Sequence, residues 1–392
     1  MRRGWRRWCG TGMAVLVLLG GVGLGMAASP AGPEAWLKQA GFGPYQEARF
    51  DPEALYQKAK AEGRVTAYSY SSRIVEVAKT FEQRYPGIKV QGFDMDSAEI
   101  VTKVLAEQSA KNYVADVVYM KDPATALQVL MKPGHLFAYV PGDLAPLLRP
   151  EYREPFLIHH LSFDVLIYNS AGQAKAPVSS LWDLTKPEWQ GRVLFPDPQV
   201  LPEFTEVLAT IVQHSPEMAK DYERVFGKAL QLSPGVPDAG REWIKRLLAN
   251  KVTLAKSTND VAIAVGRAEA ARAPIGFTAM SRLRDKEKDP KLQFDVAYDL
   301  KPAGAVTTGV LLAVPAYAPH PSAAKLLIRW LMGDARGGEG YKPYFVLGDA
   351  PTRSDQPLPS GMRPIEHGWY ADPAYVWANG RAILDFWLAN LK

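Results

Sequence analysis

The chain is 392 residues long and carries a formal net charge of +5, with a single cysteine. Because ordinary domains hold about 100–200 residues, this length predicts two lobes, each with its own core. Four arginines lie within the first seven residues, so the rest of the chain is nearly neutral, and we expect no nucleic-acid partner because a broad basic surface is missing.

The N-terminal segment is typical of an export signal. The basic residues Arg2 to Arg7 precede the apolar run Met13–Leu24, and small residues follow it. The run has about a dozen residues, whereas a membrane-spanning helix needs about 20. We therefore predict a signal peptide over residues 1–28, cleaved near Ala27 or Ala28, and a periplasmic mature protein. Cys9 precedes the apolar run, so we expect no thiol, disulfide or lipid anchor in the mature protein.

The stretch Arg64–Val90 predicts a strand, a helix and a second strand. Arg64–Tyr68 alternates and is rich in strand-forming residues, and from Ile74 apolar residues recur every three or four positions until a Pro-Gly pair. Such βαβ units form parallel sheets, and ligands bind at the carboxyl ends of their strands. The hydroxyl-rich turn Ser69–Ser72 is therefore the first candidate site.

The rest of the chain alternates between helices and strands. Helices are predicted over residues 52–60, 98–110, 124–131, 203–213, 216–230, 242–250, 259–271 and 322–332, and strands over 115–120, 161–169, 193–195, 251–255, 274–278, 294–298 and 308–314. This pattern predicts an α/β fold with a first crossing between lobes at 161–169 and a return at 294–314. We expect lobe 1 over 29–168, lobe 2 over 169–298, and a return to lobe 1 with C-terminal helices over 299–392. The aromatic tail around Trp377 and Trp387 is expected to pack on lobe 1.

No catalytic signature is present in the sequence. It contains no G-x-S-x-G elbow, no H-E-x-x-H helix, no Walker loop and no C-x-x-C pair, and its carboxylates are scattered. His159 and His160 are neighbours on a predicted strand, so we expect their side chains to point to opposite faces rather than to share a metal. We therefore expect no enzyme activity, no catalytic residue, no metal ligand and no cofactor.

Five stretches resemble one known family, in the family's order. They are AYSYSSR at 67–73, FEQRYPGIKV at 81–90, ADVVYMKDP at 115–123, LWDLTKPEWQGRVLFPDP at 181–198 and HPSAAKLLIRWLMG at 320–333. Together they resemble bacterial extracellular solute-binding proteins of ABC importers, in the ferric-iron-binding subgroup, over about residues 52–355. The resemblance implies a periplasmic-binding-protein-like type II fold, in which two α/β lobes joined by hinge crossings close on a solute. It also implies that a monomer delivers this solute to an ABC transporter permease in the inner membrane.

One position departs from the pattern of that family. Iron-binding members carry adjacent tyrosines after a strand that corresponds to Ile275–Phe277, and here Ser281 and Arg282 take those positions. Arginine cannot ligate a cation, but its donors suit a carboxylate or phosphate. We therefore expect a small anionic organic solute; the alternatives are ferric iron with a synergistic anion and a secreted enzyme.

The candidate ligand-binding residues come from both lobes. They are Ser71, Ser72, Arg73, Asp122, Thr205, Asn259, Asp260, Thr278 and Arg282. Structural alternatives stay open, because the serines, Asp122 and the Asn259-Asp260 pair can also cap helices, and the arginines can form salt bridges. Of Tyr68 and Tyr70, one is expected in the core, and the other could stack on a solute or supply a phenolate.

Overall fold

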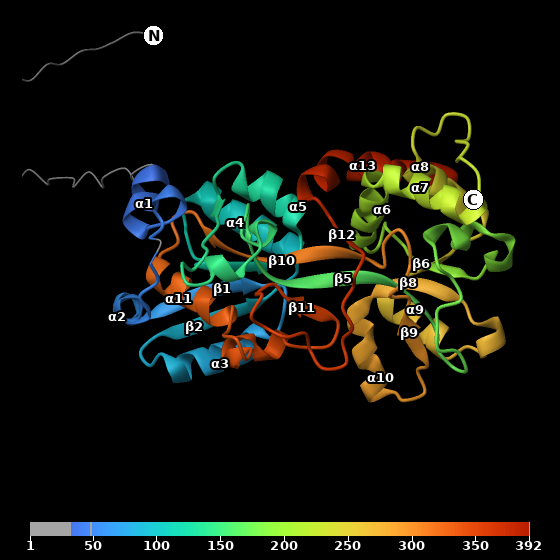
Figure 1. The fold of residues 1–392 in the computed structure, drawn as a ribbon. Helices are drawn as coiled ribbons and strands as arrows, with labels where there is room; N and C mark the ends of the chain where they lie inside the picture. The colour runs from blue at the N-terminus through green and yellow to red at the C-terminus, as the bar shows by residue number, and fades with distance from the viewer. Residues whose placement is uncertain (1–32, 48, 392) are drawn as a thin grey trace, which may run out of the picture.

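The structure is a computed structural model that describes residues 33–47 and 49–391. Figure 1 shows two bodies side by side; we call the one that holds residues 64–120 lobe 1 and the one that holds residues 193–279 lobe 2. The predicted signal peptide, residues 1–28, lies outside the described residues. Within the described part, no helix combines the length and apolar character that a membrane crossing requires.

Twelve strands form one continuous sheet in the described chain. Their bounds are β1 Arg64–Ser69, β2 Lys89–Asp94, β3 Val117–Met120, β4 Leu136–Phe137, β5 Leu157–Asn169, β6 Val193–Pro196, β7 Thr253–Ala255, β8 Ile275–Ala279, β9 Phe294–Val296, β10 Ala305–Pro315, β11 Asp349–Pro351 and β12 Gly368–Tyr370. The main path runs β2-β1-β3-β10-β5-β8-β6-β7; β4 and β12 pair with β10, and β9 and β11 pair with β5.

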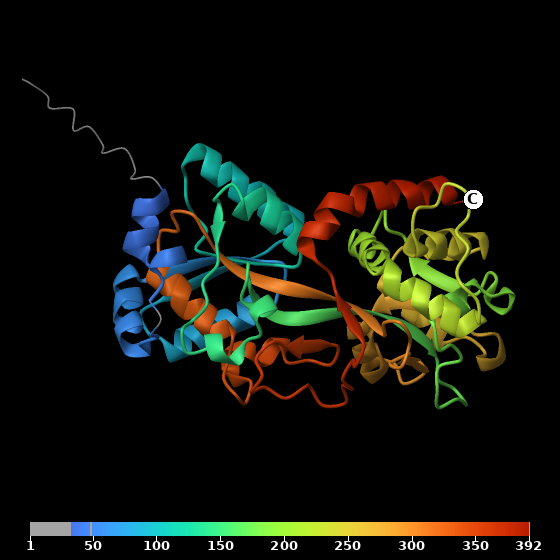
Figure 2. The ribbon, with the colours of Figure 1, turned by 45° about the horizontal axis from the view of Figure 1, so that its top comes forward.

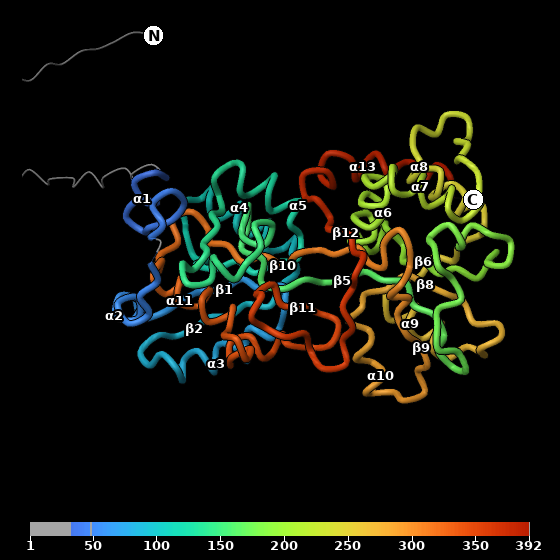
Figure 3. The backbone as a smooth tube through the Cα atoms, in the orientation of Figure 1, coloured from blue at the N-terminus to red at the C-terminus, as the bar shows by residue number. Residues whose placement is uncertain are grey.

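The strands β5 and β10 join the two lobes. β1 is parallel to β2 and β3 in lobe 1, and β6 is parallel to β7 and β8 in lobe 2. Between these two groups, β5 and β10 are antiparallel to each other, and the tube in Figure 3 follows the chain out along β5 and back along β10. This mixed α/β architecture confirms the predicted fold class, including the parallel strands of the opening βαβ unit. The exact lobe boundaries at residues 168 and 298 stay predictions.

Helices lie on both sides of the sheet in each lobe (Figures 1 and 2). Their bounds are α1 Pro33–Ala40, α2 Pro52–Glu62, α3 Ile74–Arg84, α4 Ser97–Ala110, α5 Pro123–Thr125, α6 Glu203–Gln213, α7 Ser215–Phe226, α8 Ala239–Ala249, α9 Thr258–Gly266, α10 Asp285–Lys288, α11 Pro321–Leu331, α12 Gly338–Tyr341 and α13 Pro373–Asn390. Several begin where the sequence predicts; for example, the Asp51 carboxylate accepts a hydrogen bond of 3.0 Å from the Ala54 N–H at the start of α2.

Three clusters of buried apolar side chains form the core. One fills lobe 2 around Trp182, Trp243 and Phe195, all fully buried. A second packs the outer face of lobe 1, where α3 and α11 cover the sheet. The third extends from lobe 1 along β5 and β10 into lobe 2, so apolar contacts link the two lobes at the strands that join them.

The C-terminal tail packs mainly on lobe 2 and only in part on lobe 1, where the sequence predicts it. α13 lies along lobe 2 in Figure 2, and Ile383 and Trp387 are fully buried in the lobe 2 cluster. The Trp387 ring lies 5.0 Å from the Phe195 ring, between centroids. The expectation of packing on lobe 1 is correct only in part: α13 also contacts α5 of lobe 1, but its main partners are α6 and α8 of lobe 2, a pairing that local pattern cannot reveal.

Two tryptophans of α13 test this packing. Trp387→Ala should lower the free energy of unfolding by about 3–5 kcal/mol, because it removes a fully buried ring from a packed core. Trp377→Ala is the matched control on the same helix, since Trp377 is 48% exposed, and its effect should stay within about 0.5 kcal/mol. Chemical denaturation measures both, and equal effects would contradict this placement of α13.

Candidate functional site

Charged side chains from both lobes meet where β5 and β10 pass between them. We call this group, Arg73, Lys121, Asp164, Glu206, Arg284 and Asp349, the interlobe site. Arg73 precedes α3 and Lys121 follows β3, both in lobe 1, whereas Glu206 lies on α6 and Arg284 ends the short helix η8 (Met280–Arg284) in lobe 2. The carboxyl ends of strands in both lobes thus point at one region, as the α/β topology predicts.

Asp349 connects the two lobes through two arginines. The Arg284 Nη1 donates to the Asp349 Oδ2 over 3.3 Å, and the Arg73 Nη1 lies 3.9 Å from the same oxygen. The Asp349 side chain is only 9% exposed, whereas those of Arg73 and Arg284 are 31% and 26% exposed. Burial raises the pKa of the Asp349 carboxyl, and Arg284 and Arg73 counteract that shift. Both contacts exceed the usual 2.7–2.9 Å of charge-assisted hydrogen bonds, so the guanidinium groups retain donors for another oxyanion.

Two carboxyl groups and a lysine form the other side of the interlobe site. Neither carboxylate oxygen of Asp164 has a hydrogen-bond partner in the structure, although the residue is 3% exposed. Burial raises the pKa of Asp164 to about 6, while Lys121 acts in the opposite direction. Burial alone would lower the pKa of Lys121, but Asp164 and other negative groups raise it above its usual value. The lysine is therefore a stable positive charge in this site.

Glu206 is neutralised by its surroundings. It accepts a hydrogen bond of 3.2 Å from the Thr308 hydroxyl on β10, which links lobe 2 to a joining strand. Burial, and then the negative charge of Asp122, raise the pKa of Glu206 to about 8. Its carboxyl group is therefore mostly protonated at neutral pH, which leaves positive charge prominent in the interlobe site.

A glycine allows the two lobes to touch beside Asp349. A Cβ atom on Gly348 would lie 2.5 Å from the Ser281 Cα and 2.6 Å from the Ser281 backbone nitrogen. The φ angle of Gly348 is +97°, a left-handed conformation that favours glycine. The backbone before β11 is therefore in close contact with η8, and a side chain at Gly348 would disturb this contact.

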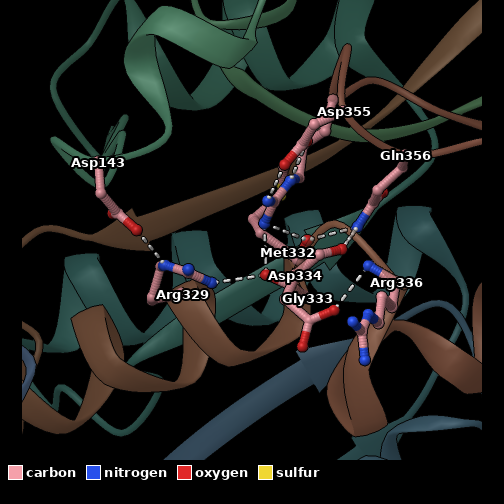
Figure 4. A network of polar contacts seen from close by, with 9 residues as sticks. Asp143, Arg329, Met332, Gly333, Asp334, Arg336, Asp355 and Gln356 are labelled. Carbon is pink, nitrogen blue, oxygen red and sulfur yellow. Dashed lines mark hydrogen bonds and ion pairs between the residues drawn. The ribbon is translucent and has the colours of Figure 1, made fainter.

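The segment that carries Asp349 is anchored to the end of α11 (Figure 4). The buried Arg353 donates to the carbonyl oxygens of Met332 and Gly333 and forms an ion pair of 2.7 Å with Asp355. Gln356 donates to the carbonyl oxygens of Met332 and Asp334 over 3.2 and 2.7 Å. These carbonyls follow the last turn of a helix, where unpaired oxygens and the helix dipole favour such donors. The anchor fixes the position of the segment around Asp349.

Of the predicted residues of lobe 1, one makes a charged contact and three lie at the starts of helices. Arg73 belongs to the interlobe site. No side chain caps α3; instead, the N–H groups of Ile74 and Val75 donate to the carbonyl oxygens of Ser71 and Ser72 over 3.2 Å. Asp122 caps α5, because its carboxylate accepts a hydrogen bond of 2.9 Å from the Thr125 N–H. The capping alternative thus describes Asp122 but not the two serine side chains.

The predicted residues of lobe 2 make their contacts with residues outside the interlobe site. Asn259 and Asp260 are exposed at the start of α9, where Ser257 is the cap. Thr278 is fully buried and donates to the Thr258 carbonyl over 2.9 Å. Arg282 pairs with Asp285 at 3.1 Å, and Thr205 lies on the side of α6 that faces Gly380 of α13. Solute contacts of these residues stay predictions.

Sequence reasoning missed five members of the interlobe site. Lys121 follows a predicted strand directly, and Arg284 lies two residues after a candidate, so position alone could have found these two. Asp164, Glu206 and Asp349 carry no local signal, because strand pairing and burial bring them to the site.

The prediction for the two histidines is wrong. β5 carries a bulge opposite β10, where Val310 pairs with His160 but Leu311 pairs with Ile158, so His159 is the additional residue. A bulge places two residues of one strand opposite one of its partner, and the usual alternation is lost. Consequently both rings lie on one side, with their Nδ1 atoms 2.9 Å apart.

The interlobe site contains charge but no ready-made metal cluster. Across residues 33–47 and 49–391, no group of three or more His, Cys, Asp or Glu side chains is placed to hold a metal ion. A cavity of about 690 Å³ lies elsewhere, on lobe 1 between the ends of α3 and α11, and contains no member of the interlobe site. The interlobe site itself gathers charged groups from both lobes, which suits recognition of a charged group.

Comparison with known proteins identifies the class. Residues 65–336 match the family described as bacterial extracellular solute-binding protein, and the chain belongs to this family. It is accordingly a binding protein and not an enzyme, and its family places it outside the cytoplasm. No match is found among the curated proteins.

Solved structures share the fold at low sequence identity. Iron-bound HitA from Pseudomonas aeruginosa has a TM-score of 0.63 and 18% identity, over 83% of this chain and 99% of that one. Ferric iron-binding protein A from Mannheimia haemolytica, in an open conformation, has a TM-score of 0.65 and 16% identity, over 84% and 98%. Trichodesmium IdiA (FutA) in complex with iron and citrate ligands has a TM-score of 0.63 and 15% identity, over 84% and 99%. These likenesses confirm the two-lobed type II periplasmic-binding-protein fold.

Gly348 provides a test of lobe closure. Gly348→Ala should shift the unliganded protein toward an open form, because the added methyl group would overlap the backbone of Ser281. The matched control is Gly361→Ala, since Gly361 has a φ of +79° and no atom within 4 Å of an added Cβ. Small-angle X-ray scattering should give a larger radius of gyration for Gly348→Ala alone. The same radius for both variants would mean that this contact does not limit closure.

Glu206 predicts how stability depends on pH. Since its folded-state pKa is raised, its stabilising contribution is complete below the unfolded value of about 4.3 and is lost as pH rises through about 8. Glu206→Gln should therefore make the decline of the unfolding free energy over this range shallower, by at most about 1.4 kcal/mol per pH unit. Denaturation at several pH values measures the slope, with the exposed Glu188→Gln as control; an unchanged slope in Glu206→Gln would refute the assignment.

Proposed function

We propose that this protein captures ferric iron in the periplasm as a negatively charged complex with a small carboxylate or other oxyanion. The loaded protein then delivers the complex, as a monomer, to an ABC transporter permease in the inner membrane. This proposal favours the ferric alternative of the sequence analysis over a metal-free organic anion, and it keeps the anion as the part that the protein recognises.

The observation that carries the proposal is the convergence of three cationic side chains from both lobes. Arg73 and Lys121 come from lobe 1, and Arg284 comes from lobe 2. A chelated ferric ion brings its own oxygen ligands, so the protein needs donors for the outer oxygens of the complex and no complete metal cluster. Guanidinium and ammonium groups are such donors.

The solved structures support the ferric part of the proposal. Two of the three are described with bound iron, and one of these also holds citrate. Binding across the two lobes would favour the closed form, because a ligand shifts a conformational equilibrium by its difference in affinity for the two states. The Asp349 carboxylate contacts Arg73 and Arg284 in the absence of solute, and the oxyanion of the solute would replace it as the acceptor of their N–H groups.

A metal-free organic anion is the second candidate. It is favoured by Ser281 and Arg282, which stand where the resemblance expects tyrosines and which supply no phenolate to a ferric ion. In the structure the Arg282 Nε atom is buried without a partner, so this guanidinium retains a donor that an anion could use.

Thermal unfolding with three additions separates the candidates. Ferric citrate should raise the melting temperature, because a ligand at a hundredfold excess over Kd stabilises the folded state by about 2.7 kcal/mol. Citrate alone should raise it much less. An equal shift with citrate alone would favour the organic anion, and no shift with ferric citrate, citrate or a panel of other organic anions would contradict both candidates.

The arginines provide the matched variants. Arg73→Ala and Arg284→Ala should each weaken ferric citrate binding by about tenfold to a hundredfold, since each removes a charge-assisted contact worth about 1.5–3 kcal/mol. Arg381→Ala is the control, because Arg381 is 84% exposed on α13, away from the interlobe site. Isothermal titration measures the affinities, and wild-type affinity in both test variants would rule out recognition by these two residues.

A further inference from the structure

Three donor atoms form a compact triangle inside lobe 1, next to the interlobe site. The Tyr119 hydroxyl oxygen lies 3.0 Å from the His159 Nδ1 and 3.1 Å from the His160 Nδ1, and the two Nδ1 atoms are 2.9 Å apart. Tyr119 is on β3, and the histidines are at the bulge of β5. Because the third donor is a tyrosine oxygen, this trio differs from a cluster of His, Cys, Asp and Glu alone.

The protons available do not satisfy all three contacts. The His159 Nε2 lies 2.9 Å from the Leu331 carbonyl oxygen, which only accepts, so this nitrogen carries the proton. A neutral His159 therefore presents a lone pair at Nδ1. The triangle then holds at most two protons, one on the Tyr119 oxygen and one on the His160 Nδ1, for three mutual contacts. No arrangement of two protons gives three linear hydrogen bonds.

The surroundings keep both imidazoles neutral and hold them in place. His159 and His160 are each 1% exposed, and Tyr119 is fully buried. Burial lowers the pKa of His159 well below its usual value and that of His160 to about 3, where Arg73 also contributes. The Tyr344 ring packs 4.8 Å from the His159 ring, between centroids. The Tyr344 hydroxyl is buried without a hydrogen-bond partner.

We propose that Tyr119, His159 and His160 bind a divalent transition-metal ion. An ion with bonds of about 2.1 Å at right angles holds neighbouring ligand atoms about 3.0 Å apart, and the three measured separations are 2.9–3.1 Å. Two neutral imidazoles with one oxygen on a single face suit Fe²⁺, Co²⁺ and Ni²⁺. The hydrogen bond from the other nitrogen of His159 to a backbone carbonyl is the usual support for a metal-bound histidine.

Positive side chains near the three donor atoms act against the binding of a cation. Arg73, Lys121 and Arg284 all lie near enough to His160 to lower its pKa, and they oppose a bound cation. Asp349 offsets part of this charge, because it pairs with two of the three. Burial, and then the neighbouring tyrosines and Asp349, raise the pKa of Tyr119 well above its usual value, and a bound cation would act in the opposite direction; the phenolate formed on metal binding would offset a further charge. The site goes beyond the proposed solute site, because its ligands lie in the core of lobe 1.

Cobalt titration of the chelator-treated full-length protein tests this site. Wild type should bind one Co²⁺ per chain, develop visible cobalt absorption and gain melting temperature. Tyr119→Phe removes only the ligand oxygen, and His160→Gln removes one ring; each should weaken Co²⁺ binding at least about tenfold. His367→Ala removes an exposed histidine and should bind Co²⁺ like wild type.

Three results would overturn the proposal. The first is a wild-type protein that binds no Co²⁺, and the second is a Tyr119→Phe variant with wild-type affinity for Co²⁺. The third is a His367→Ala variant that loses as much Co²⁺ binding as the other variants, since this would indicate adventitious binding at the surface. If His160→Gln does not fold, Tyr119→Phe still decides the outcome. Ferric citrate should stabilise Tyr119→Phe as it does wild type, so failure of this metal site and failure of the proposed function give different results.

Discussion

The antiparallel pairing of β5 with β10 is the constraint on which the other features depend. These two strands belong to both lobes, and their register brings Asp164, Thr308 and the two histidines to the level where the lobes meet. The ladder stays intact across the junction, so the lobes can hinge about it while each keeps its own sheet. The bulge at His159 lies in the same ladder, and for this reason the histidine pair and the interlobe site are neighbours.

Electrostatics at the junction explains why the site favours an anionic solute. Burial raises the free energy of every charged group at the junction, and neighbouring groups compensate this cost for some side chains more than for others. Glu206 becomes neutral, with a pKa of about 8, whereas the arginines stay charged and share the single carboxylate of Asp349 over contacts of 3.3 and 3.9 Å. Long contacts of this kind are easily exchanged for an incoming oxyanion. The two arginines that contact Asp349 in the structure are therefore those that would bind the solute.

Local sequence pattern predicts much of the fold. The βαβ opening, the caps at Asp51 and Asp122 and the two joining strands depend on periodicity and on short-range hydrogen bonds, which a sequence displays directly. The main partners of α13 cannot be predicted locally, because α6 and α8 are more than a hundred residues away in the chain. The histidine pair was misread because a bulge depends on the partner strand and has no local signal here.

The site could be predicted only in part. The family resemblance of the stretch 67–73 points to Arg73, and the stretch 115–123 that contains Lys121 resembles the same family. Asp349 and Glu206 are brought to the site by long-range pairing and become important through burial, which the sequence alone does not show. The two serines before α3 illustrate the reverse, because a strong local pattern for side-chain capping is replaced in the structure by backbone contacts.

The most direct measurement of the central claim is anomalous X-ray diffraction at the iron edge on crystals grown with ferric citrate. We predict an iron peak between the lobes, with the citrate carboxylates in contact with Arg73, Lys121 and Arg284 and with Asp349 displaced from the arginines. An iron ion held entirely by protein side chains, or iron and citrate bound away from this junction, would contradict the account.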